Sequence, residues 1–73
     1  MHTLETHGLF CPEPVMLTQQ QLRKMQAGES LQLVATDPAT LRDIPKLCRF
    51  LGHVLVSQEE ADGEYRFVIE KSA

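Results

Sequence analysis

The apolar positions of the chain change between two spacings, one typical of helices and one typical of strands. In two segments the apolar side recurs three and four residues apart, which places it on one face of a helix. In the first segment, from about Pro12 to Gln26, these positions are Val15, Thr18, Leu22 and Met25. In the second, which Gly52 ends, they are Leu41, Ile44, Cys48 and Leu51. The sequence therefore predicts two amphipathic helices.

Four shorter segments are expected to form strands, because apolar and polar residues alternate in them or β-formers predominate. They are Thr3–Thr6, Leu31–Ala35, Val54–Gln58 and Tyr65–Glu70. The last two are separated by a stretch containing Asp62-Gly63, which predicts an antiparallel hairpin. The order βαβαββ predicts one α+β domain over residues 1–73, a two-layer α/β sandwich with two helices on one face of a four-stranded mixed sheet.

The start of the second helix carries two specific signals. The Asp37 carboxylate can accept a hydrogen bond from a first-turn amide, and Pro38 suits the first helical position. Pro45 is expected to interrupt or kink the helix, with Asp43 able to cap a new start. If the helix continues instead, a basic stripe runs opposite the apolar one, either as a solvated face or as a docking surface for an acidic partner; its residues are Arg42, Lys46 and Arg49.

Size and charge exclude several classes of function. A domain of 73 residues buries only about 60% of its unfolded surface, so no deep pocket is expected. The net charge of −3 has the wrong sign for neutralising phosphates, so we expect no strong direct binding of nucleic acid. No apolar run approaches the roughly 20 residues that span a bilayer, and the N-terminal residues lack an export signal. We therefore expect a cytoplasmic protein without a membrane partner.

Without an export signal, the two cysteines are expected to be free thiols. Cys48 shares the apolar stripe of the second helix and is expected in the core. A metal site is not expected, since there is no C-x-x-C pair and no local pair of ligands among His2, His7 and His53. His7 lies four residues before Cys11. Its side chain could help to hold a thiolate, or it could be an exposed loop residue.

The segment with the clearest chemistry is Gly8-Leu9-Phe10-Cys11-Pro12-Glu13-Pro14. Pro12 and Pro14 fit a first helical turn, because amides there have no acceptor within the helix. A cysteine at this position faces the positive end of the helix dipole, which favours the thiolate, whereas the charge of Glu13 opposes it. Cys11 is thus a candidate nucleophile that needs no cofactor; the alternative is a small apolar residue in a rigid turn.

The chain resembles the TusA/SirA family of sulfur carriers over nearly its whole length. The resemblance rests on the motif around Cys11 and on several further segments. They are Thr36-Asp37-Pro38-Ala39-Thr40, Arg42-Asp43-Ile44-Pro45, Cys48 and His53-Val54-Leu55-Val56. The resemblance implies a sulfurtransferase whose Cys11 accepts persulfide sulfur from a cysteine desulfurase. It also implies onward transfer to a TusBCD-type relay protein and, finally, 2-thiolation of the wobble uridine of tRNA.

The resemblance further suggests positions that dock the desulfurase, namely Met16, Arg23, Asp37 and Phe50. The chain departs from the family in having Glu5 where aspartate is usual, Phe10 where a polar or basic residue is frequent, and Gln19 at a basic position.

Other functions remain compatible with the sequence. The same Cys11 could serve dissimilatory sulfur metabolism or molybdenum-cofactor assembly with other partners. A regulatory interaction module would not need the thiol at all. A thiol-disulfide oxidoreductase is disfavoured, because no resolving cysteine lies nearby. Persulfide transfer itself needs only an exposed thiolate that attacks, and is later attacked at, a terminal sulfur.

Overall fold

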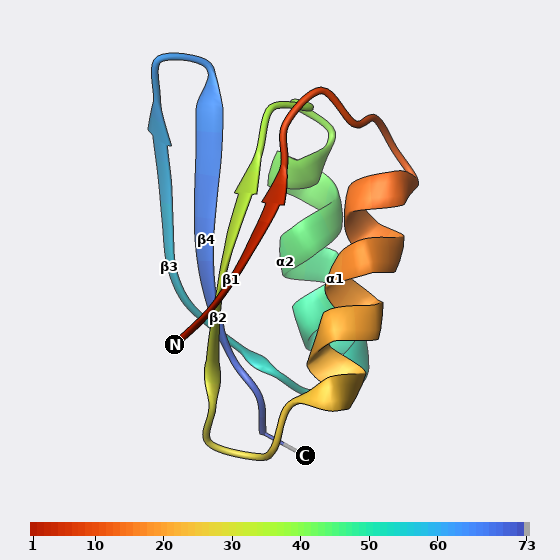
Figure 1. The fold of residues 1–73 in the computed structure, drawn as a ribbon, viewed down its shortest axis with the longest axis vertical. Helices are drawn as coiled ribbons and strands as arrows, with labels where there is room; N and C mark the ends of the chain where they lie inside the picture. Colours follow the sequence, from red (N-terminus) through yellow and green to blue (C-terminus); the bar gives the residue numbers. More distant parts are fainter. Residues whose placement is uncertain (73) are drawn as a thin grey trace.

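The computed structural model describes residues 1–72. Its elements are β1 (His2–Thr6), α1 (Glu13–Lys24), β2 (Ser30–Ala35), α2 (Thr40–Leu51), β3 (Val54–Ala61) and β4 (Glu64–Glu70). The sheet order is β1-β2-β4-β3; β1 and β2 are parallel, and the other neighbouring pairs are antiparallel. Both helices cover one face of this sheet (Figure 1). The predicted α+β sandwich with βαβαββ order is confirmed.

The core lies between the two central strands and the helices. In the register of β2 and β4, Leu31 pairs with Ile69 and Leu33 with Phe67, and all four side chains are fully buried. The cluster is completed by Leu22 of α1, by Met25 at the C-cap of α1, and by Ile44 and Cys48 of α2. The predicted stripes of both helices therefore face the sheet.

The predicted interruption of the second helix at Pro45 is wrong, because α2 is one helix from Thr40 to Leu51. A proline inside a helix costs roughly 3 kcal/mol through a lost hydrogen bond and a steric clash. Ile44 and Cys48 lie on either side of Pro45 and are both buried in the unbroken helix; burial of the isoleucine side chain alone contributes about 1.5–3 kcal/mol. Burial on both sides of the proline thus outweighs its local cost.

The end of α2 at Gly52 agrees with the sequence. Gly52 has φ of 79°, in the left-handed region that glycine adopts without strain. The amide of His53 then donates to the carbonyl of Cys48 at 2.8 Å, which closes the last turn. Across residues 1–72, neither helix is long and apolar enough to cross a membrane.

Candidate active site

Cys11 lies in the loop between β1 and α1, at the end of the molecule where both helices begin. Because β1 and β2 are parallel and each leads into a helix, the β1–α1 and β2–α2 loops lie at the same end of the sheet (Figure 1). Cys11 is a free, exposed thiol two residues ahead of Glu13, the first residue of α1. The predicted position of the thiol at a helix start is therefore correct.

Hydrogen bonds to the neighbouring β2–α2 loop hold the Cys11 loop in place. The amide of Gly8, whose φ is 77°, donates to Thr36 Oγ1 at 2.9 Å. The amide of Cys11 donates to Asp37 Oδ2 at 2.7 Å, and the amide of Ala39 donates to Asp37 Oδ1 at 3.1 Å. Asp37 is only 8% exposed, so its carboxylate joins the start of α2 to the backbone of the thiol loop.

Pro14 lies in the first turn of α1, as the sequence predicted, whereas Pro12 occupies the N-cap position one residue before the helix. Pro12 is exposed and precedes the helix, whereas Pro14 is buried and its carbonyl accepts from Thr18 Oγ1 at 2.7 Å. The amide of Glu13 donates to the Phe10 carbonyl at 3.0 Å, so the loop leads directly into the helix. The side chain of Glu13 is exposed.

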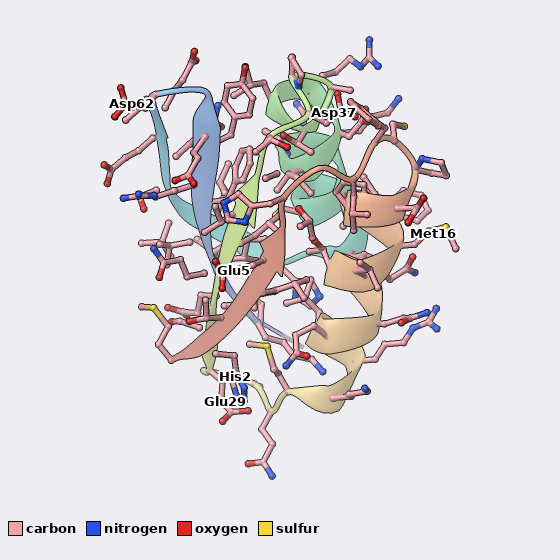
Figure 2. The ribbon with its side chains drawn as sticks, turned by 45° about the horizontal axis from the view of Figure 1, so that its top comes forward. His2, Glu5, Met16, Glu29, Asp37 and Asp62 are labelled. Carbon is pink, nitrogen blue, oxygen red and sulfur yellow. The ribbon has the colours of Figure 1, made fainter. Side chains whose placement is uncertain are left out.

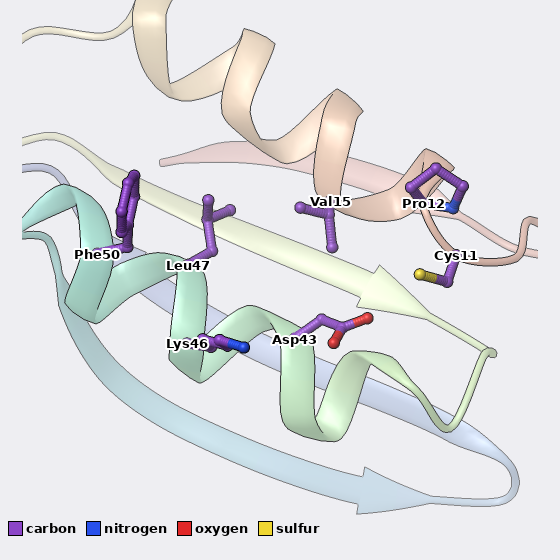
Figure 3. Close-up of a pocket in the computed structure, with 7 residues that line it drawn as sticks. All are labelled: Cys11, Pro12, Val15, Asp43, Lys46, Leu47 and Phe50. Atoms are coloured by element: carbon purple, nitrogen blue, oxygen red, sulfur yellow. The ribbon is translucent and has the colours of Figure 1, made fainter.

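Cys11 lines one end of a groove between α1 and α2 with a volume of about 350 Å³ (Figure 3). Its walls are mostly apolar, from Pro12, Val15, Leu47 and Phe50, with charged groups from Asp43 and Lys46. Phe50 is 85% exposed and contributes a large apolar surface to one wall of the groove. The groove is open to solvent, in keeping with the expectation that this domain has no deep pocket.

The carboxylate of Asp43 is directed toward the Cys11 sulfur across the groove (Figure 3). It raises the pKa of the Cys11 thiol, chiefly by hydrogen bonding and also by its charge; the Asp37 charge adds to the increase, and Arg42 opposes it. The helix N-termini favour the thiolate, and the carboxylates act on the thiol in the opposite direction. The sequence suggested Glu13 as the opposing charge and missed Asp43, whose proximity depends on the pairing of β1 with β2.

The second thiol is in a different environment. Cys48 is 2% exposed in the core, as predicted, and burial raises the pKa of its thiol. His7 does not lie among the groove residues: its Nε2 is 2.7 Å from Glu64 Oε2, and its Nδ1 is 3.7 Å from Glu5 Oε2. The structure therefore places one accessible thiol in the groove and pairs His7 with carboxylates.

The docking positions suggested by the sequence do not all lie together. Met16 is 52% exposed and points outward from the start of α1 (Figure 2), on the same end of the molecule as Cys11. Arg23 is near the other end of α1, in a separate groove that it lines with His53 and Lys71. The basic residues Arg42, Lys46 and Arg49 are exposed along the continuous helix α2.

Within residues 1–72, the structure contains no cluster of three or more His, Cys, Asp or Glu residues suited to a metal ion.

Comparison with known proteins connects this site to one family. The family model described as "Sulfurtransferase TusA" matches residues 2–71. Two similar relatives are both named "Sulfur carrier protein TusA". The one from Pseudomonas entomophila is 52% identical, covering 97% of this chain and 89% of its own length. The one from Pseudomonas savastanoi pv. phaseolicola is 53% identical, covering 93% and 81%.

A solved structure independently supports the fold. The crystal structure of a SirA-like protein from Desulfitobacterium hafniense covers all of both chains with a TM-score of 0.88, at 21% identity. At that identity the likeness concerns the fold, whereas the family model and the Pseudomonas relatives establish kinship over nearly the whole chain. The chain thus belongs to the TusA family of sulfurtransferases and sulfur carriers.

Proposed function

We propose that this chain carries sulfur in the cytoplasm as a persulfide on Cys11. A cysteine desulfurase supplies the sulfur, and a TusBCD-type relay protein receives it for 2-thiolation of the tRNA wobble uridine. The observation that carries the proposal is the contrast between the two thiols: Cys11 is exposed beside a groove, and Cys48 is buried. The name that the Pseudomonas relatives share supports the carrier role.

The transfer needs no redox cofactor. In loading, the Cys11 thiolate attacks the terminal sulfur of the donor's persulfide; a new S–S bond forms, and the donor's S–S bond breaks. The donor leaves as a thiolate and takes up one proton, balancing the proton that Cys11 lost. In unloading, an acceptor thiolate attacks the outer sulfur on Cys11 and regenerates the Cys11 thiolate. The exposure of Cys11 supports this cycle, because both partners must reach its sulfur directly.

Partner docking is proposed on the surface around the Cys11 groove. Three large apolar side chains are exposed in the chain segments next to it or lining it: Phe10 at 68%, Met16 at 52% and Phe50 at 85%. Phenylalanine and methionine are enriched in the cores of protein–protein interfaces relative to the rest of the surface. Asp37 has little exposed surface and holds the Cys11 amide, so we propose that it affects docking by positioning the thiol loop.

Arg23 is proposed as a more distant contact, roughly 15 Å along α1 from the thiol end at about 1.5 Å per residue. At this distance it cannot adjust the sulfur, so Arg23→Glu should slow loading by the desulfurase severalfold while leaving iodoacetamide alkylation of Cys11 unchanged. Added salt should reduce the difference, because exposed charges are screened. Lys24→Glu is the matched control, an exposed neighbour that does not line the Arg23 groove. Equal loading rates in Arg23→Glu and wild type would remove Arg23 from the docking surface.

The tRNA branch can be tested in cells that lack their own carrier. Expression of this chain should restore 2-thiouridine in tRNA, measured by mass spectrometry of tRNA nucleosides. The competing pathways, dissimilatory sulfur metabolism and molybdenum-cofactor assembly, would use the same Cys11. If the chain becomes loaded with sulfur but 2-thiouridine does not return, the tRNA assignment is wrong and those pathways are favoured.

A further inference from the structure

Asp43 lies in the first turn of α2, where a negative charge interacts favourably with the helix dipole, and it also faces the thiol groove. The residue lies inside the helix, and Asp37 already accepts the main-chain amide of Ala39 ahead of the first turn. The Asp43 side chain is 19% exposed, and the structure pairs its Oδ1 with Arg42 Nε at 3.3 Å. It also lines the groove with Cys11, and its carboxylate is directed at the sulfur (Figure 3).

We propose that Asp43 is a positioning residue that holds the unloaded Cys11 as a protonated thiol in the groove. Its carboxylate faces the thiol in the groove, where it can accept from the S–H group and where it repels a thiolate. Cys11 would then gain reactivity when a cationic group of a docked partner pairs with Asp43. This inference rests on the proposed role of Cys11 in accepting sulfur.

The charged groups near the thiol come from α2, from the loop before it and from the start of α1. Asp43, Arg42 and Lys46 are on α2, Asp37 is in the loop before it, and Glu13 begins α1. The pKa of Cys11 is raised by Asp43 first and by Asp37 to a smaller degree, whereas Arg42 lowers it. Arg42, a nearby cation, thus lowers the pKa of the Cys11 thiol, whereas Asp43 raises it. A cation of a docked partner would lower this pKa in the same way.

This arrangement protects the exposed Cys11 thiol from electrophiles and oxidants before a partner protein docks. The thiolate is the form that reacts with electrophiles and oxidants, and low-pKa exposed cysteines are the ones most readily oxidised. A raised pKa leaves less thiolate at neutral pH, so adventitious capping of Cys11 is slowed. Docking would then bring both the sulfur donor and a cation that pairs with Asp43, so that Cys11 can lose its proton.

The test is the pH dependence of iodoacetamide alkylation of Cys11, followed by mass spectrometry of the Cys11 peptide. In Asp43→Asn the midpoint should move to lower pH, and the rate at pH 7 should rise about threefold or more. Arg42→Gln should move the midpoint to higher pH. The effect of Arg42→Gln should shrink in the double variant, because Arg42 is paired with Asp43.

Two controls separate this restraint from a structural effect. Asp43→Glu keeps the carboxylate and should retain a raised midpoint. Asp62→Asn makes the same chemical change at the distant β3–β4 turn (Figure 2), where asparagine tolerates the positive φ of 53°; its profile should match wild type. An unchanged profile in a folded Asp43→Asn protein overturns the inference. Because alkylation needs no sulfur donor, this result is independent of whether Cys11 carries sulfur.

Discussion

Cys11→Ser is expected to abolish sulfur loading and onward transfer. A serine hydroxyl cannot form a persulfide, and the remaining thiol, Cys48, is only 2% exposed. Serine is close in size to cysteine and the position is exposed, so the fold should be unaffected. The measurement is the transfer of radiolabelled sulfur from cysteine, through a desulfurase, to the variant.

The matched variant is Cys48→Ala, which should load as wild type does. It removes a buried sulfur and should cost about 1 kcal/mol in the free energy of unfolding. Loading that survives in Cys11→Ser but is lost in Cys48→Ala would reverse the roles of the two thiols. A non-catalytic regulatory module makes a separate prediction, namely that Cys11→Ser remains fully functional in cells.

Phe67→Ala should produce the largest loss of stability of any single substitution considered. Phe67 is the largest fully buried side chain, in the middle of β4 and paired with Leu33. Truncation of a core phenylalanine costs about 3–5 kcal/mol. The whole domain is expected to have roughly 4–11 kcal/mol at typical values per residue, so the variant should be partly or wholly unfolded. Urea denaturation followed by circular dichroism measures the change.

Val68→Ala is the control for this prediction. Val68 is the next residue of the same strand and is only partly buried, on the sheet face away from the helices. Its loss should be about 1 kcal/mol or less. Equal destabilisation by the two substitutions would contradict the assignment of the core to the helical face of the sheet.

The element order and core faces were predictable because they depend on local periodicity. The stripe of Leu41, Ile44 and Cys48 placed one face of α2 correctly, although the interruption expected at Pro45 of the same segment does not occur. Both signals are local, but the burial that decides between them depends on the sheet beneath the helix. The sequence therefore predicted correctly which face of α2 is buried, but it predicted wrongly that the helix is interrupted at Pro45.

The site was predictable where one segment carries it and unpredictable where two segments meet. The motif around Cys11 indicated an exposed thiol at a helix start, and the structure has it there. The bond from the Cys11 amide to Asp37, and the proximity of Asp43, arise only when parallel strands bring the two loops together. The distance between these two loops cannot be read from the spacing of residues along the sequence. The effect of the Asp43 charge on the Cys11 thiol was therefore missed.

The most direct test of the central claim is the intact mass of the wild-type protein after incubation with a cysteine desulfurase and cysteine. The account predicts the addition of one sulfur atom, removable by a reductant. Peptide mapping under non-reducing conditions should locate this atom on the peptide that contains Cys11. No added mass, or a sulfur found on the Cys48 peptide, would contradict the proposal that this chain carries sulfur on Cys11.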